Sequence, residues 1–515
     1  MQPPLEGPAA RTYFGHPPGL YVLFFTEMWE RFSYYGMRAL LIFYLTKHWL
    51  FSDEKASVIY GAYTALVYIT PVIGGYLADR YLGQRKAVVF GAVVLCFGHL
   101  LMGVEGDGGQ GSPTLNLFWL ALSFIIVGSG FLKANISVIV GQLYPRTDPR
   151  RDPAYTIFYM GINLGAAIGA ALCGYLGETY GWSFGFGAAG IGMLFGLAVF
   201  VAGKPLLMGK GEPPDPPRLA QRIGGLRLEW LLYAGGLASV GVVWWLVQHQ
   251  EVVGRLLGFA GALLVGYVLY TAVFRLPAED RDRIFAALFL IIGSILFWAL
   301  FEQAGSSLNL YTDRFVDRAG VPASVFQSIN AVYIVLLGPV FAGLWLWLAN
   351  RGLEPSAPAK FGLAMIQLGA GFLVLVVGAA AGGPTPVVFI FLIYLLHTTG
   401  ELCLSPVGLS AMNRLAPAHM ASLVMGTWFF ASATGNFAAG LIAAAAGANE
   451  AGSGAASQQT VLDVYTTVGW VAIGAGLAVL AASPLVRRLM HLDTLRDTAE
   501  RDTLPRIARP PGLPG

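Results

Sequence analysis

Charged residues are scarce in this sequence. Only 12% of its 515 residues are Asp, Glu, Lys or Arg, whereas 56% are hydrophobic. Soluble globular chains carry about 25% charged residues, so this deficit excludes a soluble enzyme of several domains and indicates a membrane protein in contact with lipid. The net charge of +3 comes without a basic cluster, and we therefore expect no nucleic acid as a partner.

Cysteine is also rare, and the motifs of several chemistries are missing. Cys96, Cys173 and Cys403 lie in separate apolar runs without a Cys-x-x-Cys spacing, which predicts neither a disulfide framework nor a metal site. There is no HExxH motif, no G-x-x-x-x-G-K-[ST] loop and no His/Asp cluster at metal-ligand spacing. We therefore expect no membrane-embedded enzyme, no ATP-driven pump and no cofactor.

Long apolar runs fill most of the chain. A spanning helix needs about 20 apolar residues, and fourteen runs are long enough: 19–46, 57–78, 87–104, 115–143, 155–177, 183–203, 228–248, 252–274, 284–311, 323–349, 361–381, 385–412, 420–447 and 463–486. The most polar internal segment, 203–227, follows the sixth run. We expect an all-α polytopic protein: a six-helix unit in 1–203, a linker with two extra helices in 204–280, a second six-helix unit in 281–490, and a tail in 491–515.

The basic residues of the loops indicate the orientation. With the N-terminus inside, the inner loops hold 17 Lys and Arg residues and the outer loops hold five. An excess of positive charge marks the cytoplasmic side, and an even number of spans returns the chain to it. We therefore expect a multi-pass protein of the cell (inner) membrane with both termini in the cytoplasm.

Seven charged residues at membrane depth do not fit this orienting role: Arg31, Arg38, Lys133, Glu27, Glu30, Glu302 and Glu401. A charge at the bilayer centre costs at least about 2.5–3.5 kcal/mol, so each needs a partner or a wet cavity. Six polar residues of the first run share one helical face: Glu27, Glu30, Arg31, Tyr34, Tyr35 and Arg38. This face is interpreted as part of a site for a polar solute; the alternative is an ion-pair ladder that locks the helix to a neighbour.

Lys133 and Glu401 occupy the fourth run of each half, as two parallel repeats would place them. Opposite charges in corresponding helices suggest a site between the halves that suits a zwitterion. Glu302 is a candidate proton carrier, and the alternative is a permanent salt bridge to Arg38 or Arg31. Taken alone, Asn163 and Asn330 are amides of the kind that form hydrogen bonds between helices. Taken alone, Trp298 and Trp428 are typical packing residues.

Four segments resemble a known family. Residues 27–36 match ExxERFxYYG, the helix 1 signature of the proton-dependent oligopeptide transporter (POT) family. Residues 158–165, FYMGINLG, and 400–406, GELCLSP, resemble that family's helix 5 and helix 10 signatures. Residues 75–86, GYLADRYLGQRK, resemble the loop between helices 2 and 3 of the major facilitator superfamily. The resemblance runs from about residue 19 to residue 488 and implies the major facilitator fold.

The resemblance implies a role for each matching residue. Arg31, Tyr35 and Lys133 match positions that hold a peptide carboxylate, and Asn163, Asn330 and Glu401 match positions that hold its amino end. Arg38 and Glu302 resemble a pair that gates the outside and takes part in proton coupling, together with Glu30 and its neighbour Glu27. Side-chain pockets are implied for Tyr68, Trp298, Trp428 and Ser432. Asp79 and Arg80 correspond to a conformational latch. Gly61 replaces the coupling histidine of animal members, so coupling should rest on carboxylates.

The expected activity is proton-coupled uptake of di- and tripeptides by alternating access, with peptides, protons and membrane lipid as partners. One alternative is a family member that moves another solute, such as nitrate or an amino-acid conjugate. Another is a receptor that binds peptide without moving it.

Overall fold

The computed structural model describes residues 12–145, 148, 150–380, 382–417, 420–447 and 457–492. Most of the expected tail, from residue 493 on, lies outside this range. The long helices are α1 (Pro18–Phe43), α2 (Asp53–Leu77), α3 (Gln84–Met102), α4 (Leu115–Gln142), α5 (Arg151–Tyr180), α6 (Trp182–Ala202), α8 (Leu228–Gln248), α9 (Gln250–Arg275), α10 (Ala278–Phe301), α12 (Ser328–Ala349), α13 (Ala357–Ala379), α14 (Val388–Leu415), α15 (Ala421–Ala446) and α16 (Gln458–Leu489).

Short elements connect these helices. They are η1 (Tyr44–His48), η2 (Ala78–Leu82), η3 (Lys204–Leu207), α7 (Pro216–Ala220), η4 (Glu302–Gly305), α11 (Ser307–Phe315), η5 (Ala323–Gln327), β1 (Arg222–Ile223), β2 (Leu226–Arg227), β3 (Val316–Asp317) and β4 (Thr385–Pro386). β1 and β2 form an antiparallel hairpin within the predicted linker. β3 and β4 pair in parallel and join two loops of the C-terminal half.

Each of the fourteen predicted runs contains one long helix. Thirteen candidate spans meet a length and hydropathy criterion in the described chain. α1 is not among them because its middle carries four charges, but its 26 residues extend over about 39 Å, enough to cross a bilayer. The prediction of an all-α polytopic membrane protein is confirmed.

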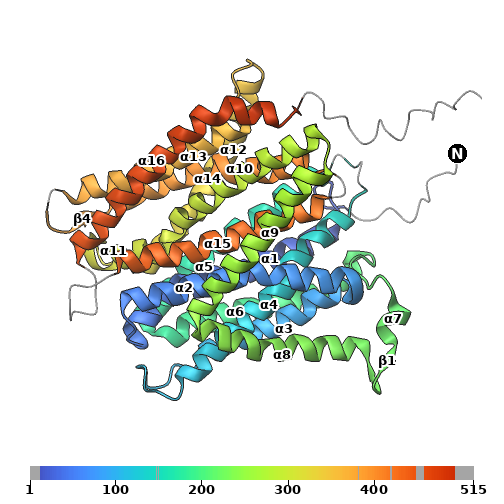
Figure 1. Ribbon diagram of the computed structural model, residues 1–515. Coiled ribbons are helices and arrows are strands. Elements are labelled where there is room, and N and C mark those ends of the chain that lie inside the picture. The colour runs from blue at the N-terminus through green and yellow to red at the C-terminus, as the bar shows by residue number, and fades with distance from the viewer. Residues whose placement is uncertain are drawn as a thin grey trace, which may run out of the picture.

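Two bundles make up the molecule (Figure 1). Helices α1 to α6 pack around one apolar core, the N-terminal bundle, and α10 to α16 around a second, the C-terminal bundle. The bundles meet where α2 packs against α15 and α5 against α12. A Cβ atom at Gly61 of α2 would lie 2.7 Å from Cα of Gly440 in α15, so the helices approach closely only because both positions are glycine.

Polar bonds join the bundles at one end, here called the α11 end. Arg314 Nη2 donates to Asp53 Oδ1 at 2.8 Å, and Lys47 Nζ lies 2.7 Å from Asp313 Oδ2. The Ser324 amide donates to Glu178 Oε1 at 2.7 Å. These bonds hold the two bundles together at the α11 end, opposite the end where η2 and the linker lie.

The run predicted at 284–311 is not one continuous helix. α10 ends at Phe301, and the 3₁₀ turn η4 separates it from α11. Gly305 of η4 packs directly against the Tyr60 hydroxyl, where a side chain would overlap it. The break lets Tyr60 and Arg38 approach the backbone beside Glu302.

Candidate functional site

The charged face of α1 forms ion pairs within its own helix. Arg31 Nε lies 2.9 Å from Glu27 Oε1 and also contacts the Glu30 carboxylate. All three side chains are buried. Among the described residues, Arg31 therefore pairs within its own helix and forms no ion-pair ladder to a neighbouring helix. In the described chain, Arg31 Nη2 and the Tyr34 hydroxyl are buried without a hydrogen-bond partner, which is uncommon for such groups.

Lys133 of α4 stands beside this face. Its Nζ lies 3.8 Å from the ring centroid of Tyr68 and 5.8 Å from that of Tyr34, distances at which a cation is attracted to an aromatic ring. No carboxylate of the described residues lies within 4.0 Å of Lys133 Nζ, so no ion pair cancels its charge. The N-terminal cluster is defined as Glu27, Glu30, Arg31, Tyr34, Tyr68 and Lys133.

A second polar group lies in the C-terminal bundle. Asn330 Nδ2 of α12 donates to Glu401 Oε2 of α14 at 3.0 Å and to Thr398 Oγ1 at 3.0 Å. The C-terminal cluster is defined as Asn330, Thr398 and Glu401. Sequence reasoning missed Thr398; the available signal was its position three residues before Glu401, on the same helical face.

Tyr35 and Tyr159 lie within electrostatic range of Glu401. Tyr35 interacts electrostatically with both Arg31 and Glu401, and Tyr159 of α5 does so with Glu401. Asn163 Nδ2 donates to the backbone carbonyl of Tyr159 at 3.1 Å. This hydrogen bond of Asn163 therefore stays within α5, and Tyr159, a residue that sequence reasoning did not single out, is the α5 side chain that interacts with Glu401.

One ion pair links the bundles beside these clusters. Arg38 of α1 donates to the Glu302 carboxylate in η4, and Arg38 Nε lies 2.5 Å from the Tyr60 hydroxyl. The residues are only 6% and 5% exposed, so breaking the pair would leave a buried charge. Of the two expected partners of Glu302, the structure selects Arg38 rather than Arg31. Tyr60 was not predicted from the sequence.

Three of the four predicted pocket residues lie on α10 and α15, which pack against each other, whereas Tyr68 lies on α2 in the N-terminal cluster. Trp298 packs against Phe297, with ring centroids 5.4 Å apart, and Trp428 packs against Phe361 at 6.4 Å. Ser432 Oγ donates to the carbonyl of Trp428 at 3.3 Å. These contacts show packing, and the pocket role stays a prediction.

The predicted latch residues lie in η2. Asp79 Oδ1 accepts from Gln84 Nε2 at 2.7 Å, and Gln84 Oε1 accepts from Gln142 Nε2 at 3.2 Å. Arg80 is exposed, and no ion pair joins it to Asp79 within the described chain. Asp79 therefore connects η2 to α3 and, through Gln84, to α4 inside the N-terminal bundle.

These features define a polytopic membrane transporter. Two helical bundles carry opposite charges in their interiors and are joined by a buried ion pair. No group of three His, Cys, Asp or Glu side chains in the described residues is arranged to hold a metal ion.

Comparison with known proteins identifies the family. The sequence model of the POT family matches residues 85–458, so the chain belongs to the POT family and is a transporter, not an enzyme. It is similar to the peptide transporter YePEPT of Yersinia enterocolitica, with 37% identity over 86% of this chain and 90% of that protein. It is also similar to dipeptide and tripeptide permease B of Photorhabdus luminescens, with 32% identity over 92% of this chain and 97% of that protein.

The fold agrees with this assignment. A crystal structure of a POT peptide transporter variant in complex with alafosfalin is similar, with a TM-score of 0.81, 34% identity and coverage of 94% of this chain and 97% of that one. The predicted major facilitator fold and the resemblance to the POT family are both confirmed.

Proposed function

We propose that this protein takes up di- and tripeptides together with protons across the cytoplasmic (inner) membrane, by alternating access. The observation that carries the proposal is the placement of Lys133 and Arg31 in one bundle and Glu401 in the other. A free peptide is a zwitterion, so its two termini match these opposite charges. Names of the similar proteins support this substrate class.

The buried polar atoms suggest how each terminus is held. Arg31 Nη2, the Tyr34 hydroxyl and Lys133 Nζ offer donors or positive charge to a carboxylate, and hydrogen bonds between charged groups are stronger than neutral ones. Glu401 would accept from the peptide ammonium group while Asn330 orients its carboxylate. Trp298, Trp428 and Ser432 would contact peptide side chains, as the family resemblance implies.

The Arg38–Glu302 pair is the proposed site of coupling. It joins α1 to η4 across the bundles, so a proton on Glu302 would remove the anion that holds Arg38 and weaken closure at the α11 end. Glu27 and Glu30 are further proton acceptors beside Arg31. Each inward positive charge gains about 2.3 kcal/mol per 100 mV of membrane potential. No covalent bond changes, so no cofactor is required.

The distribution of basic residues supports an orientation. Arg80, Arg85 and Lys86 lie at the η2 end and Lys204 in η3, and such positive charge favours the cytoplasmic side. The linker end would then face the cytoplasm, with both termini, and the α11 end would face outside. In this orientation the structure is closed toward the outside.

The test is flux of dialanine into liposomes that contain the purified protein, with external acid and an inside-negative potential. We expect accumulation, and we expect Glu401→Gln to weaken peptide binding about 10- to 100-fold, because a charged hydrogen bond contributes about 1.5–3 kcal/mol. Glu354→Gln is the control, since Glu354 pairs with Lys360 and lies outside the site. Binding without flux would indicate a receptor, and neither binding nor flux in folded protein would refute the proposal.

A further inference from the structure

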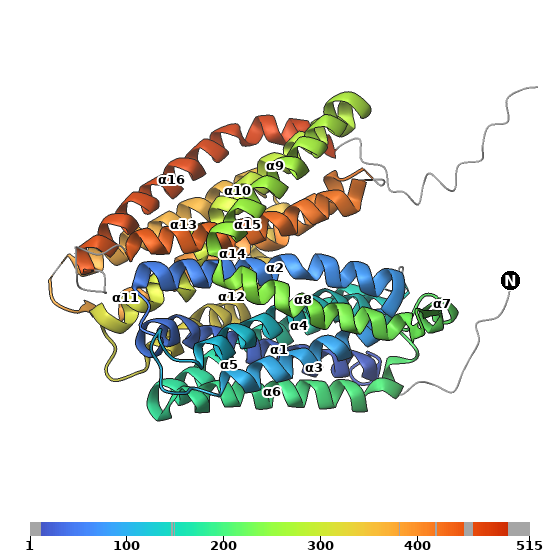
Figure 2. The ribbon, with the colours of Figure 1, turned by 60° about the horizontal axis from the view of Figure 1, so that its bottom comes forward.

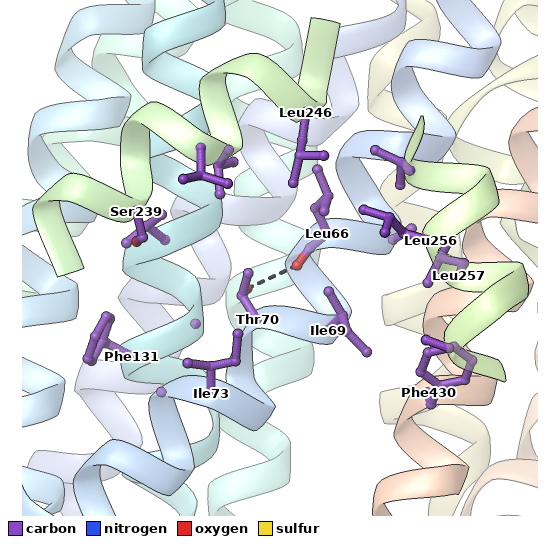
Figure 3. A pocket seen from close by; sticks show the side chains of 18 residues that line it. Leu66, Ile69, Thr70, Ile73, Phe131, Ser239, Leu246, Leu256, Leu257 and Phe430 are labelled. Carbon is purple, nitrogen blue, oxygen red and sulfur yellow. Dashed lines mark hydrogen bonds between the residues drawn. The ribbon is translucent and has the colours of Figure 1, made fainter. Parts of the chain in front are cut away.

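An apolar cavity lies beside the two extra helices (Figure 3). Its volume is about 370 Å³, and α2, α4, α8, α9 and α15 line it; this volume is within the range of about 300–1,000 Å³ for ligand pockets. The two hydroxyls of its wall are already bonded: Thr70 Oγ1 donates to the Leu66 carbonyl at 3.0 Å, and Ser239 Oγ to that of Gly236 at 2.6 Å. These hydroxyl groups therefore offer no free donor to water or to a polar ligand.

The α8–α9 hairpin divides between the two bundles. α8 packs on the N-terminal bundle, where the Tyr233 ring stacks on Phe90 with centroids 5.0 Å apart. α9 packs on the C-terminal bundle, where Phe430 lies over Gly261 of α9. Figure 2 shows α9 crossing α15 while α8 runs alongside α4. The cavity between them therefore has walls from both bundles.

One end of this hairpin is anchored. Lys55 Nζ at the start of α2 donates to Gln250 Oε1 at the start of α9, at 2.6 Å. From this point α8 and α9 both contact α2 but otherwise have different neighbours, because α8 contacts α4 and α9 contacts α15 and α10. The space that opens between them is not filled by side chains of the described residues.

The cavity lies at membrane depth and opens sideways. Its wall residues Ile73, Val242 and Leu256 are 63%, 61% and 51% exposed, and they belong to helices long and apolar enough to span. In a bilayer these surfaces face hydrocarbon rather than water. An empty space of this size would leave the wall atoms without dispersion contacts, so hydrocarbon from the bilayer is the medium available to fill it.

We propose that this cavity is a binding site for one acyl chain of a membrane phospholipid. A hydrocarbon chain makes dispersion contacts with the apolar wall, can enter the opening from the bilayer and needs no polar partner. Because the wall belongs to both bundles, the bound chain would contact surfaces that separate or approach during transport; this consequence, unlike the site itself, rests on the proposed alternating access.

The test is photolabelling of the full chain in phospholipid vesicles that contain a phosphatidylcholine with a diazirine midway along one acyl chain. Labelled peptides are located by mass spectrometry. We expect labelling concentrated on the cavity-lining parts of α2, α8 and α9. Leu256→Trp fills the cavity and should reduce this labelling to the level of the outer surface of α9. The control Leu263→Trp is two turns further along α9, is also exposed and does not line the cavity, so labelling should persist.

Equal labelling in the two variants, or labelling spread evenly over all lipid-facing helices, would overturn the proposal. If Leu256→Trp does not fold, Val242→Trp on α8 fills the same cavity from the opposite wall, with Leu237→Trp as its control. Labelling is measured without peptide or a proton gradient. A failure of transport therefore leaves this result unaffected, and a failure of labelling leaves the transport proposal standing.

Discussion

Replacement of Glu302 by Gln should open the α11 end. The substitution keeps the shape and the hydrogen-bonding oxygen but removes the charge that Arg38 faces when the end is closed. Both residues are almost fully buried, and loss of one partner from a buried ion pair costs about 3–5 kcal/mol. The open state, in which Arg38 is hydrated, does not bear this cost. The closed-to-open equilibrium should therefore shift by about two to four orders of magnitude.

Spin labels can measure this shift. Leu50 and Val321 are exposed residues of the two bundles at the α11 end, and their substitution by Cys allows a label-to-label distance distribution to be recorded by double electron–electron resonance in liposomes. The control is Glu354→Gln, because Glu354 pairs with Lys360 inside the C-terminal bundle, its side chain is 40% exposed, and such a pair contributes about 0–1 kcal/mol. We expect long distances in Glu302→Gln and an almost unchanged distribution in the control. A Glu302→Gln distribution identical to that of the unaltered protein would refute this reasoning.

Two further substitutions test the C-terminal cluster and the bundle interface. Thr398→Val removes one acceptor of Asn330, which should cost about 0.5–1.5 kcal/mol and raise the half-saturating dialanine concentration about two- to tenfold; an unchanged value would exclude Thr398 from positioning. Gly61→Val forces a side chain against Gly440, so uptake and the thermal unfolding temperature should both fall. Gly187→Val is the control, since a Cβ atom there meets open space, and equal behaviour of the two variants would contradict the packing argument.

The membrane architecture could be predicted because composition and run length determine it directly. A hydrocarbon medium requires long apolar helices, and each predicted run contains one, although the run 284–311 is interrupted at η4. The interruption at η4 was not predicted from the sequence, and the Tyr60 side chain that meets Gly305 there comes from a helix more than 200 residues earlier. Local sequence at Glu302–Gly305 contains only one glycine to suggest a break.

The candidate site was predictable where it depends on helical spacing. The Arg31–Glu27 pair is an (i, i+4) pair, and this spacing places both on one face of α1. Which arginine pairs with Glu302 depends on how two segments distant in the sequence meet in the fold. The sequence therefore allowed Arg31 as well as Arg38 as the partner. Thr398 was missed because a hydroxyl group can bond to a carbonyl of its own helix, as Thr398 does to Tyr394, and so is common in apolar helices. Tyr159 was missed because an uncharged aromatic residue does not stand out as a charge does.

The charges of the two clusters support coupling of a proton to a zwitterion. The N-terminal cluster holds two carboxylates, Glu27 and Glu30, and two cations, Arg31 and Lys133, so its formal charges sum to zero although both carboxylates contact Arg31. A peptide carboxylate bound to Arg31 and Lys133 gives the cluster and the carboxylate together one net negative charge, whereas the peptide ammonium is offset by Glu401. One proton taken up by the N-terminal cluster restores its balance. Since an unbalanced charge is costly at membrane depth, peptide binding favours proton binding, and linkage requires the converse as well.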